Sequence, residues 1–188
     1  MFRRLYSTAI GTTSVSTSSY EIAANLLRCY QRRGPLAQKQ FIDANQLQRL
    51  SQTLNRPELH PGHSIARSPP ENGTILPPGY HLGYFTPSAF EAELGGDGSD
   101  QVFNPSAPFT RRMWAGGKMI WFRDNSLRVG DTVTETTTLL SAEPKKKRNG
   151  EDMIVVEVEK RFENKNGVAL IDKRQVSLGN ELGAIYSN

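Results

Sequence analysis

The last third of the chain alternates between apolar and polar positions in the way that predicts β-strands. Three runs, residues 131–141, 153–162 and 168–178, are rich in β-branched side chains. In the second run the apolar series is Ile154, Val156 and Val158, and the intervening series is Val155, Glu157 and Glu159. The pairs Asn149-Gly150 and Asn166-Gly167 separate the runs, and Asn-Gly is typical of tight hairpin turns. The pattern predicts an antiparallel meander with one packed face and one solvated face.

Two amphipathic helices are predicted ahead of these strands. Residues 21–33 carry an apolar face made of Ile22, Leu26 and Tyr30. Asp43 with Gln46 three residues later has the spacing of a capping box, and the stripe behind it is Leu47, Leu50 and Leu54. The packed face of the sheet needs a helix against it, and either helix is a candidate. The chain is therefore expected to have an α+β fold, with helices followed by a curled antiparallel sheet.

Loops and one unusual strand occupy the middle of the chain. Prolines predict an extended connection over residues 56–73, and a composition rich in Gly, Asp, Asn, Ser and Pro predicts a long loop over 92–108. A short strand is predicted for residues 80–85. Residues 113–122 are apolar on both faces, which predicts a strand in the centre of the sheet. The pair Gly116-Gly117 within it indicates a bulge, or a close approach by a ligand or another backbone.

Composition limits the classes of protein that this chain can represent. Its 188 residues suffice for one domain with a core but hardly for two. The net charge of +4 is too mild to predict nucleic-acid binding, and no apolar stretch approaches the roughly 18 residues of a membrane span. Cys29 is the only cysteine, which excludes disulfide scaffolds and cysteine metal clusters. A soluble globular protein is the expectation.

The first 20 residues have the composition of a mitochondrial transit peptide. They contain two arginines and nine Ser or Thr, and no acidic residue precedes Glu21. Import segments are basic, hydroxylated and poor in acid, whereas a disordered tail is the alternative. We therefore divide the chain into a transit peptide over 1–20 and an amphipathic helix or linker over 21–35.

Candidate chemistry is sparse. His60 and His63 lie three residues apart in a proline-rich loop without acidic or thiol partners, so no metal site is predicted. Residues 145–148 are a basic run, which has the features of a nuclear signal, a solvated turn or a contact for a phosphate-rich carrier. The candidate substrate-binding residues combine cations, aromatic or thioether side chains and glycines on one strand: Arg111, Arg112, Met113, Trp114, Gly116 and Gly117. A strand with merely solvated arginines is the alternative.

Three strings resemble the N-terminal half of the MaoC-like hydratase/dehydratase family: APFTRRMWAGG, LPPGYHLGYF and DANQLQRLSQTLNRP. Within that family they are most similar to the fungal mitochondrial hydroxyacyl-thioester dehydratases of type 2. The similarity covers roughly residues 36–178, which we take as one hot-dog domain, and residues 179–188 form a divergent tail. The fold that the resemblance implies is a curled antiparallel sheet around a helix, here a single hot dog with an N-terminal helical extension.

The resemblance also implies an activity and separate roles for two hot-dog domains. Family members dehydrate 3-hydroxyacyl thioesters of acyl carrier protein or coenzyme A in mitochondrial type II fatty-acid synthesis, without a cofactor. They have two hot dogs, of which the first accommodates the acyl chain and the second supplies the catalytic Asp and His. None of the three histidines here matches that motif, so no catalytic residue is assigned. The expected partner is a second hot-dog domain or a second copy, in the mitochondrial matrix. The alternative is a single hot dog that binds acyl thioesters or a partner chain without turnover.

Overall fold

The computed structural model describes residues 18–96 and 98–179. The predicted transit peptide and the predicted divergent tail fall almost wholly outside the described residues. In chain order, the helices and strands are α1 (Ser19–Arg33), β1 (Leu36–Phe41), α2 (Ala44–Thr53), the 3-10 helices η1 (Tyr80–Gly83) and η2 (Glu91–Glu93), β2 (Arg111–Trp121), β3 (Thr132–Lys146), β4 (Asp152–Asn164) and β5 (Gly167–Gly179). The predicted α+β class is confirmed.

All five strands form one antiparallel sheet in the order β1-β3-β4-β5-β2. The meander β3-β4-β5 follows the three predicted runs, and its strands reverse where the Asn-Gly pairs stand. Gly150 and Gly167 have φ angles of 86° and 105°, the left-handed region that a tight reversal requires. The predicted alternation also holds, since Ile154, Val156 and Val158 are buried and the residues between them are not.

The prediction that residues 113–122 form a central strand is wrong. They belong to β2, which lies at one edge of the sheet and pairs only with β5. Its apolar residues on both faces are partly exposed, and the most exposed of them, Trp114, has 63% of its surface accessible. The predicted bulge is present, because the register with β5 shifts between Trp114 and Gly116. Apolar residues on both faces here mark an edge that remains open to solvent.

Two further elements differ from the sequence-based expectation. Residues 80–83 form a 3-10 helix and no strand, because Gly79 turns the chain at φ 87° and both Tyr80 and Tyr84 then point into the core. The strand β1 was not predicted, since its sequence is mostly Gln, Lys and Ala. Pairing with β3, from Leu36 opposite Thr137 to Phe41 opposite Thr132, makes it a strand.

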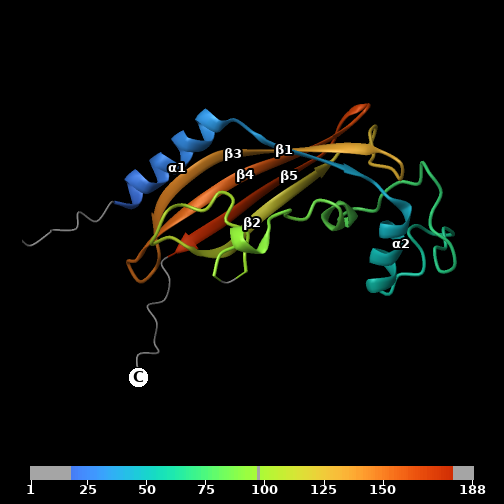
Figure 1. Cartoon of the computed structure of the whole chain (residues 1–188), viewed down its shortest axis with the longest axis horizontal. Coiled ribbons are helices and arrows are strands. Elements are labelled where there is room, and N and C mark those ends of the chain that lie inside the picture. Colours follow the sequence, from blue (N-terminus) through green and yellow to red (C-terminus); the bar gives the residue numbers. More distant parts are fainter. Residues whose placement is uncertain (1–17, 97, 180–188) are drawn as a thin grey trace, which may run out of the picture.

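The two helices lie near opposite ends of the sheet, with α1 alongside β3 and α2 at the far end (Figure 1). Ser18 caps α1 in a capping box with Glu21. Of the predicted apolar face, Ile22 and Leu26 are buried together with Ala23, and Tyr30 is partly buried against the same cluster. The Asp43 side chain accepts a hydrogen bond from the Gln46 N–H at 2.9 Å at the start of α2. Leu47 is fully buried, but Leu54, predicted in the same stripe, is 53% exposed because the helix ends before it.

Each helix contributes to a separate core cluster. The α1 cluster combines that helix with Phe103, Phe109 and the buried residues at one end of β3, β4 and β5. The α2 cluster combines Leu47 with loop residues and with Val133, Phe162 and Leu170 near the other ends of these strands. The middle of the packed face lies between the two clusters. This gap positions the candidate site.

Candidate functional site

A groove of about 760 Å³ lies over the middle of the packed face of the sheet. Its sheet side is formed by β2, β3, β4 and β5, and its walls come from α1, β1 and the loop after η1. The apolar part of the lining includes Leu36, Phe103, Trp114, Val156, Val158 and Val176. The volume falls within the range of sites that bind small molecules.

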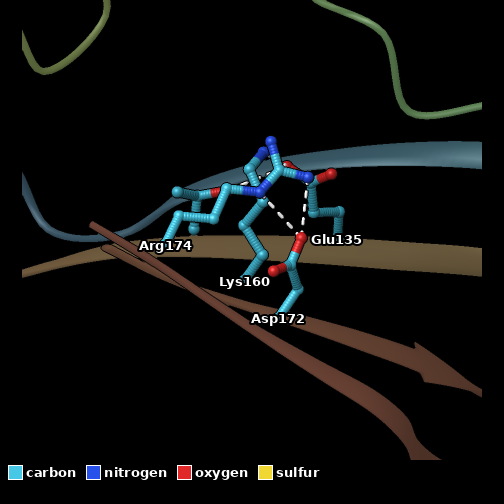
Figure 2. Close-up of polar contacts among 5 residues, drawn as sticks. Glu135, Lys160, Asp172 and Arg174 are labelled. Atoms are coloured by element: carbon cyan, nitrogen blue, oxygen red, sulfur yellow. Dashed lines mark hydrogen bonds and ion pairs between the residues drawn. The ribbon is translucent and has the colours of Figure 1, made fainter. Parts of the chain in front are cut away.

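Charged side chains form the other part of the groove floor. Glu135 on β3, Lys160 on β4 and Arg174 on β5 line the groove, and Asp172 lies beneath them. Figure 2 shows these four side chains on the same side of the sheet, turned toward one another. The register of the strands brings them together. Lys160 on β4 lies directly opposite Thr137 on β3 and opposite Asp172 on β5.

Two ion pairs hold these charges in place. Lys160 Nζ lies 2.6 Å from Glu135 Oε1, and the Thr137 hydroxyl donates to the same oxygen at 2.8 Å. Arg174 Nε donates a hydrogen bond to Asp172 Oδ2 at 2.7 Å, and Arg174 Nη2 forms an ion pair with the same oxygen at 2.7 Å. Glu135 is only 4% exposed and Asp172 only 1%. Buried carboxylates of this kind require such partners, because an unpaired charge in the core costs several kcal/mol, roughly 3–5 when one partner is removed.

One oxygen in this cluster has no partner. Glu135 Oε2 is buried and accepts no hydrogen bond from any described residue, whereas Oε1 accepts two. Lys160 and Arg174 remain partly accessible, with side chains 19% and 28% exposed. The floor therefore offers N–H donors to a ligand and contains one carboxylate oxygen that is still without a donor.

His81 lies beside the same cluster, in the core. It is 1% exposed, its ring packs edge-on against Phe162 at 5.0 Å between centroids, and its Nε2 has no hydrogen-bond partner among the described residues. Burial lowers the pKa of His81 from 6.5 to about 4, although the nearby Asp172 carboxylate opposes that change. At neutral pH the imidazole is therefore uncharged, and it packs as a core side chain.

The strand predicted to bind substrate contributes part of the groove. Arg112 and Trp114 are among its lining residues, and Arg111, Met113, Gly116 and Gly117 are not. The Trp114 ring already occupies the space beside Gly117, since a Cβ there would lie 2.8 Å from it and 2.9 Å from the Lys173 carbonyl oxygen. Gly116 has a φ of 156° at the bulge. The substrate-binding role of these six residues stays a prediction.

Reasoning from the sequence missed the charged floor, although the signal is visible. Lys160 continues the buried series Ile154, Val156 and Val158 at the same spacing of two. Asp172 and Arg174 likewise continue the series that begins at Leu170. Charged residues at positions that face the core are uncommon unless they are paired. Their position in the buried series was therefore a stronger indication of a site than the arginines of β2.

Other candidate sites have simple structural settings. His60 and His63 lie in an exposed loop, where His60 Nε2 contacts the Ile75 carbonyl oxygen at 2.9 Å. Within residues 18–96 and 98–179, no three His, Cys, Asp or Glu side chains are grouped to hold a metal ion. Cys29 is exposed on α1. None of the helices in this part of the chain is long and apolar enough to span a membrane.

Comparisons with known proteins agree with this architecture. The family model described as hydroxyacyl-thioester dehydratase type 2 matches residues 79–184. Among solved structures, the ChsH1-ChsH2 complex from Mycobacterium tuberculosis contains a similar chain, with a TM-score of 0.59 at 11% identity over 90% of this chain and 95% of that one. This likeness identifies the fold as a hot dog.

Two weaker matches were also found. A MaoC-like dehydratase from Rhodospirillum rubrum has a TM-score of 0.41 at 14% identity, over 79% of this chain and 92% of that one. The (R)-hydratase from A. caviae involved in PHA biosynthesis has a TM-score of 0.41 at 11% identity, over 76% of this chain and 92% of that one. No curated protein matches the sequence.

The buried imidazole of His81 predicts a specific dependence of stability on pH. Because its pKa is lower in the folded chain, the unfolded chain takes up a proton first as the pH falls from about 6.5 toward 4, and stability is lost over that window. Between pH 7 and pH 5 the free energy of unfolding of wild type should fall by about 2 kcal/mol more than that of His81→Phe. Urea denaturation at both pH values measures this, with His63→Phe in the exposed loop as the control. An identical pH dependence in all three proteins would contradict the assignment.

Proposed function

Because the chain belongs to the hydroxyacyl-thioester dehydratase type 2 family, we propose that it provides the substrate-binding hot dog of a dehydratase acting in mitochondrial type II fatty-acid synthesis. The observation that carries this proposal is the groove between the two core clusters. It is large enough for an acyl chain, and Val156, Val158, Val176 and Trp114 offer that chain apolar contacts. Burial of each methylene there is worth about 0.8 kcal/mol.

The acid and base for dehydration come, in this proposal, from a second hot-dog sheet. Loss of water from a 3-hydroxyacyl thioester requires a group that removes the proton next to the carbonyl and another that protonates the leaving hydroxyl. Near the groove, His81 is buried with a pKa of about 4, and the carboxylates of Glu135 and Asp172 are held in ion pairs. These features suit positioning and binding better than proton transfer.

The second sheet would join at the edge formed by β2. That strand pairs with β5 on one side only, and its 11 residues present a long edge to solvent. Trp114, Trp121 and Phe122 are 63%, 45% and 40% exposed along it. Long edges with exposed aromatic residues are usually covered, because they otherwise promote aggregation. We infer that the partner in the dehydratase is a second hot-dog sheet that carries the acid and base. When this chain is alone, a second copy of it would pair at the same edge.

A non-catalytic role is the alternative. A single hot dog that binds acyl thioesters, or a partner chain, would use the same groove and the same edge without turning substrate over. Turnover of a 2-enoyl thioester by the assembled protein distinguishes the two roles. Both proposals are compatible with either carrier, coenzyme A or acyl carrier protein.

Filling the groove should weaken binding of long acyl chains. Val176 lines the groove and is only partly buried, so Val176→Phe places an aromatic ring in space that the chain would occupy. Loss of about two methylene contacts predicts binding of a long acyl-CoA weakened about ten-fold, with little effect on acetyl-CoA. Isothermal titration calorimetry on the full chain measures both.

The matched control for this experiment is Val155→Phe. Val155 is also partly buried, but it follows Ile154 on β4 and therefore points to the opposite face of the sheet. The Val155→Phe variant should bind both thioesters with the affinity of wild type. If Val176→Phe and wild type bind the long acyl chain with equal affinity, the groove is not the acyl site.

The proposed partner predicts that the purified chain is a dimer. Light scattering after size-exclusion chromatography should give twice the mass of the chain, and Trp121→Lys should shift it to the monomer, since a lysine disfavours strand pairing at an edge. Phe90→Lys, at a residue 79% exposed in the loop before η2, should remain a dimer. A wild-type monomer across micromolar concentrations would contradict pairing between copies.

Mitochondrial import predicts that residues 1–35 carry a fluorescent reporter into the matrix. Reversal of the charges, Arg3→Glu with Arg4→Glu, should leave the reporter in the cytosol, because import segments are basic and free of acid. Fluorescence microscopy with a matrix marker measures both. A nuclear signal from the intact chain that depends on residues 145–148 would favour the basic run as the address instead.

A further inference from the structure

A second cavity, of about 300 Å³, lies where β2 ends. Its walls come from residues 75–78, from the last residue of β2 and from the segment that follows, and it shares no lining residue with the groove. We propose that this cavity is a binding site for a small aromatic carboxylate. The inference goes beyond the proposed function and does not depend on it, because it concerns a different part of the molecule.

The cavity lies on the packed face of the sheet, beside the β2 edge. Trp121 stands directly opposite Leu170 of β5, and Leu170 belongs to the core cluster that contains Leu47 of α2. Residues directly opposite each other in antiparallel strands point to the same face, so the Trp121 ring is on the packed face. A ligand in the cavity therefore does not use the backbone of the β2 edge, with which the proposed second sheet would pair.

The lining of the cavity is mostly apolar. Leu76, Leu127 and Ala169 are its buried part, whereas Trp121 and Phe122 are large apolar side chains that stay exposed. Exposed apolar side chains gathered around a concave surface are typical of ligand sites. The two aromatic rings favour an aromatic ligand, because paired rings gain stabilisation beyond the area that they bury.

The volume sets the size of the ligand. A non-hydrogen atom of a liquid such as water occupies about 30 Å³, so the cavity has room for about ten such atoms. A single aromatic ring with a short carboxylate arm has this size. The long hydrocarbon chain proposed for the groove does not fit here.

Arg123 supplies the charge that selects an anion. Among the described residues that line the cavity, it is the only one with a permanent charge, and none is Asp or Glu. The His81 ring, with its pKa lowered to about 4 by burial, is uncharged at neutral pH. A guanidinium presents a planar fork of N–H donors that matches the two oxygens of a carboxylate.

Arg123 also differs from the cations of the groove. Lys160 and Arg174 are each held by a carboxylate of the chain, at 2.6 Å and 2.7 Å. Arg123 is exposed and has no ion pair with any described residue. An anionic ligand therefore meets an available cation in this cavity, whereas in the groove it would compete with Glu135 and Asp172.

The two tryptophans of the chain allow the site to be located directly. Trp114 lines the groove and Trp121 lines the second cavity, so Trp114→Phe and Trp121→Phe each leave one reporter. The full chain of each variant is titrated with phenylacetate while tryptophan fluorescence is measured. The emission of Trp114→Phe should change and saturate at millimolar phenylacetate or below, and the emission of Trp121→Phe should stay constant.

Phenylacetamide tests the charge of the ligand, because it has the same size without the carboxylate. It should bind Trp114→Phe about ten-fold more weakly than phenylacetate does, the effect of one hydrogen bond between charged groups. Adding Arg123→Gln should remove this difference, and the exposed position of Arg123 means that the fold is retained. The matched control adds Arg49→Gln, at an exposed residue of α2 that lines neither cavity, and should keep the difference.

Three results would overturn the inference. An emission change in Trp121→Phe without one in Trp114→Phe would place phenylacetate in the groove. Equal affinities for phenylacetate and phenylacetamide, or a preference that survives Arg123→Gln, would exclude recognition of the carboxylate by this arginine. The third is a constant emission of Trp114→Phe up to about 10 mM phenylacetate. Because no thioester is used, each of these results leaves acyl-thioester binding by the groove to its own test.

Discussion

The structure depends on a mismatch of length between its sheet and its helices. The strand β3 has 15 residues and extends about 50 Å at roughly 3.3 Å per residue, whereas the 15 residues of α1 extend about 22 Å. One helix of this size covers less than half of the packed face, and α2 is shorter still. The two helices lie near opposite ends (Figure 1), so the middle of the face is left to a groove. Both core clusters and the candidate site follow from this arrangement.

The charges on the groove floor are a consequence of the same gap. At either end of the packed face the strands present Leu, Ile, Val and Phe to a helix, and burial of these side chains stabilises the fold. In the middle no helix requires an apolar surface, and Glu135, Lys160, Asp172 and Arg174 occupy the corresponding positions. Mutual pairing makes their burial tolerable (Figure 2), and the groove leaves two of them accessible.

The chemical properties of the floor separate binding from catalysis. Lys160 and Arg174 are donors fixed by their own ion pairs, which suits binding better than proton transfer. His81, which lies beside them, is uncharged and buried in the core with its ring against Phe162. Membership of the dehydratase family is consistent with the proposals that the described part of the chain binds substrate and that a second sheet pairs with the open β2 edge.

The sequence alone predicted those structural features whose physical cause lies in neighbouring residues. The alternation along β4, the Asn-Gly reversals, the Asp43 cap and the apolar face of α1 each depend on neighbouring residues, and all were predictable. The place of β2 in the sheet was not, because apolar residues on both faces look the same in a buried strand and at an open edge. Nor could spacing alone reveal that Glu135 contacts Lys160, since the two residues are 25 positions apart and their contact depends on the register between β3 and β4. The three-dimensional pairing decided where the groove lies and which charges form its floor.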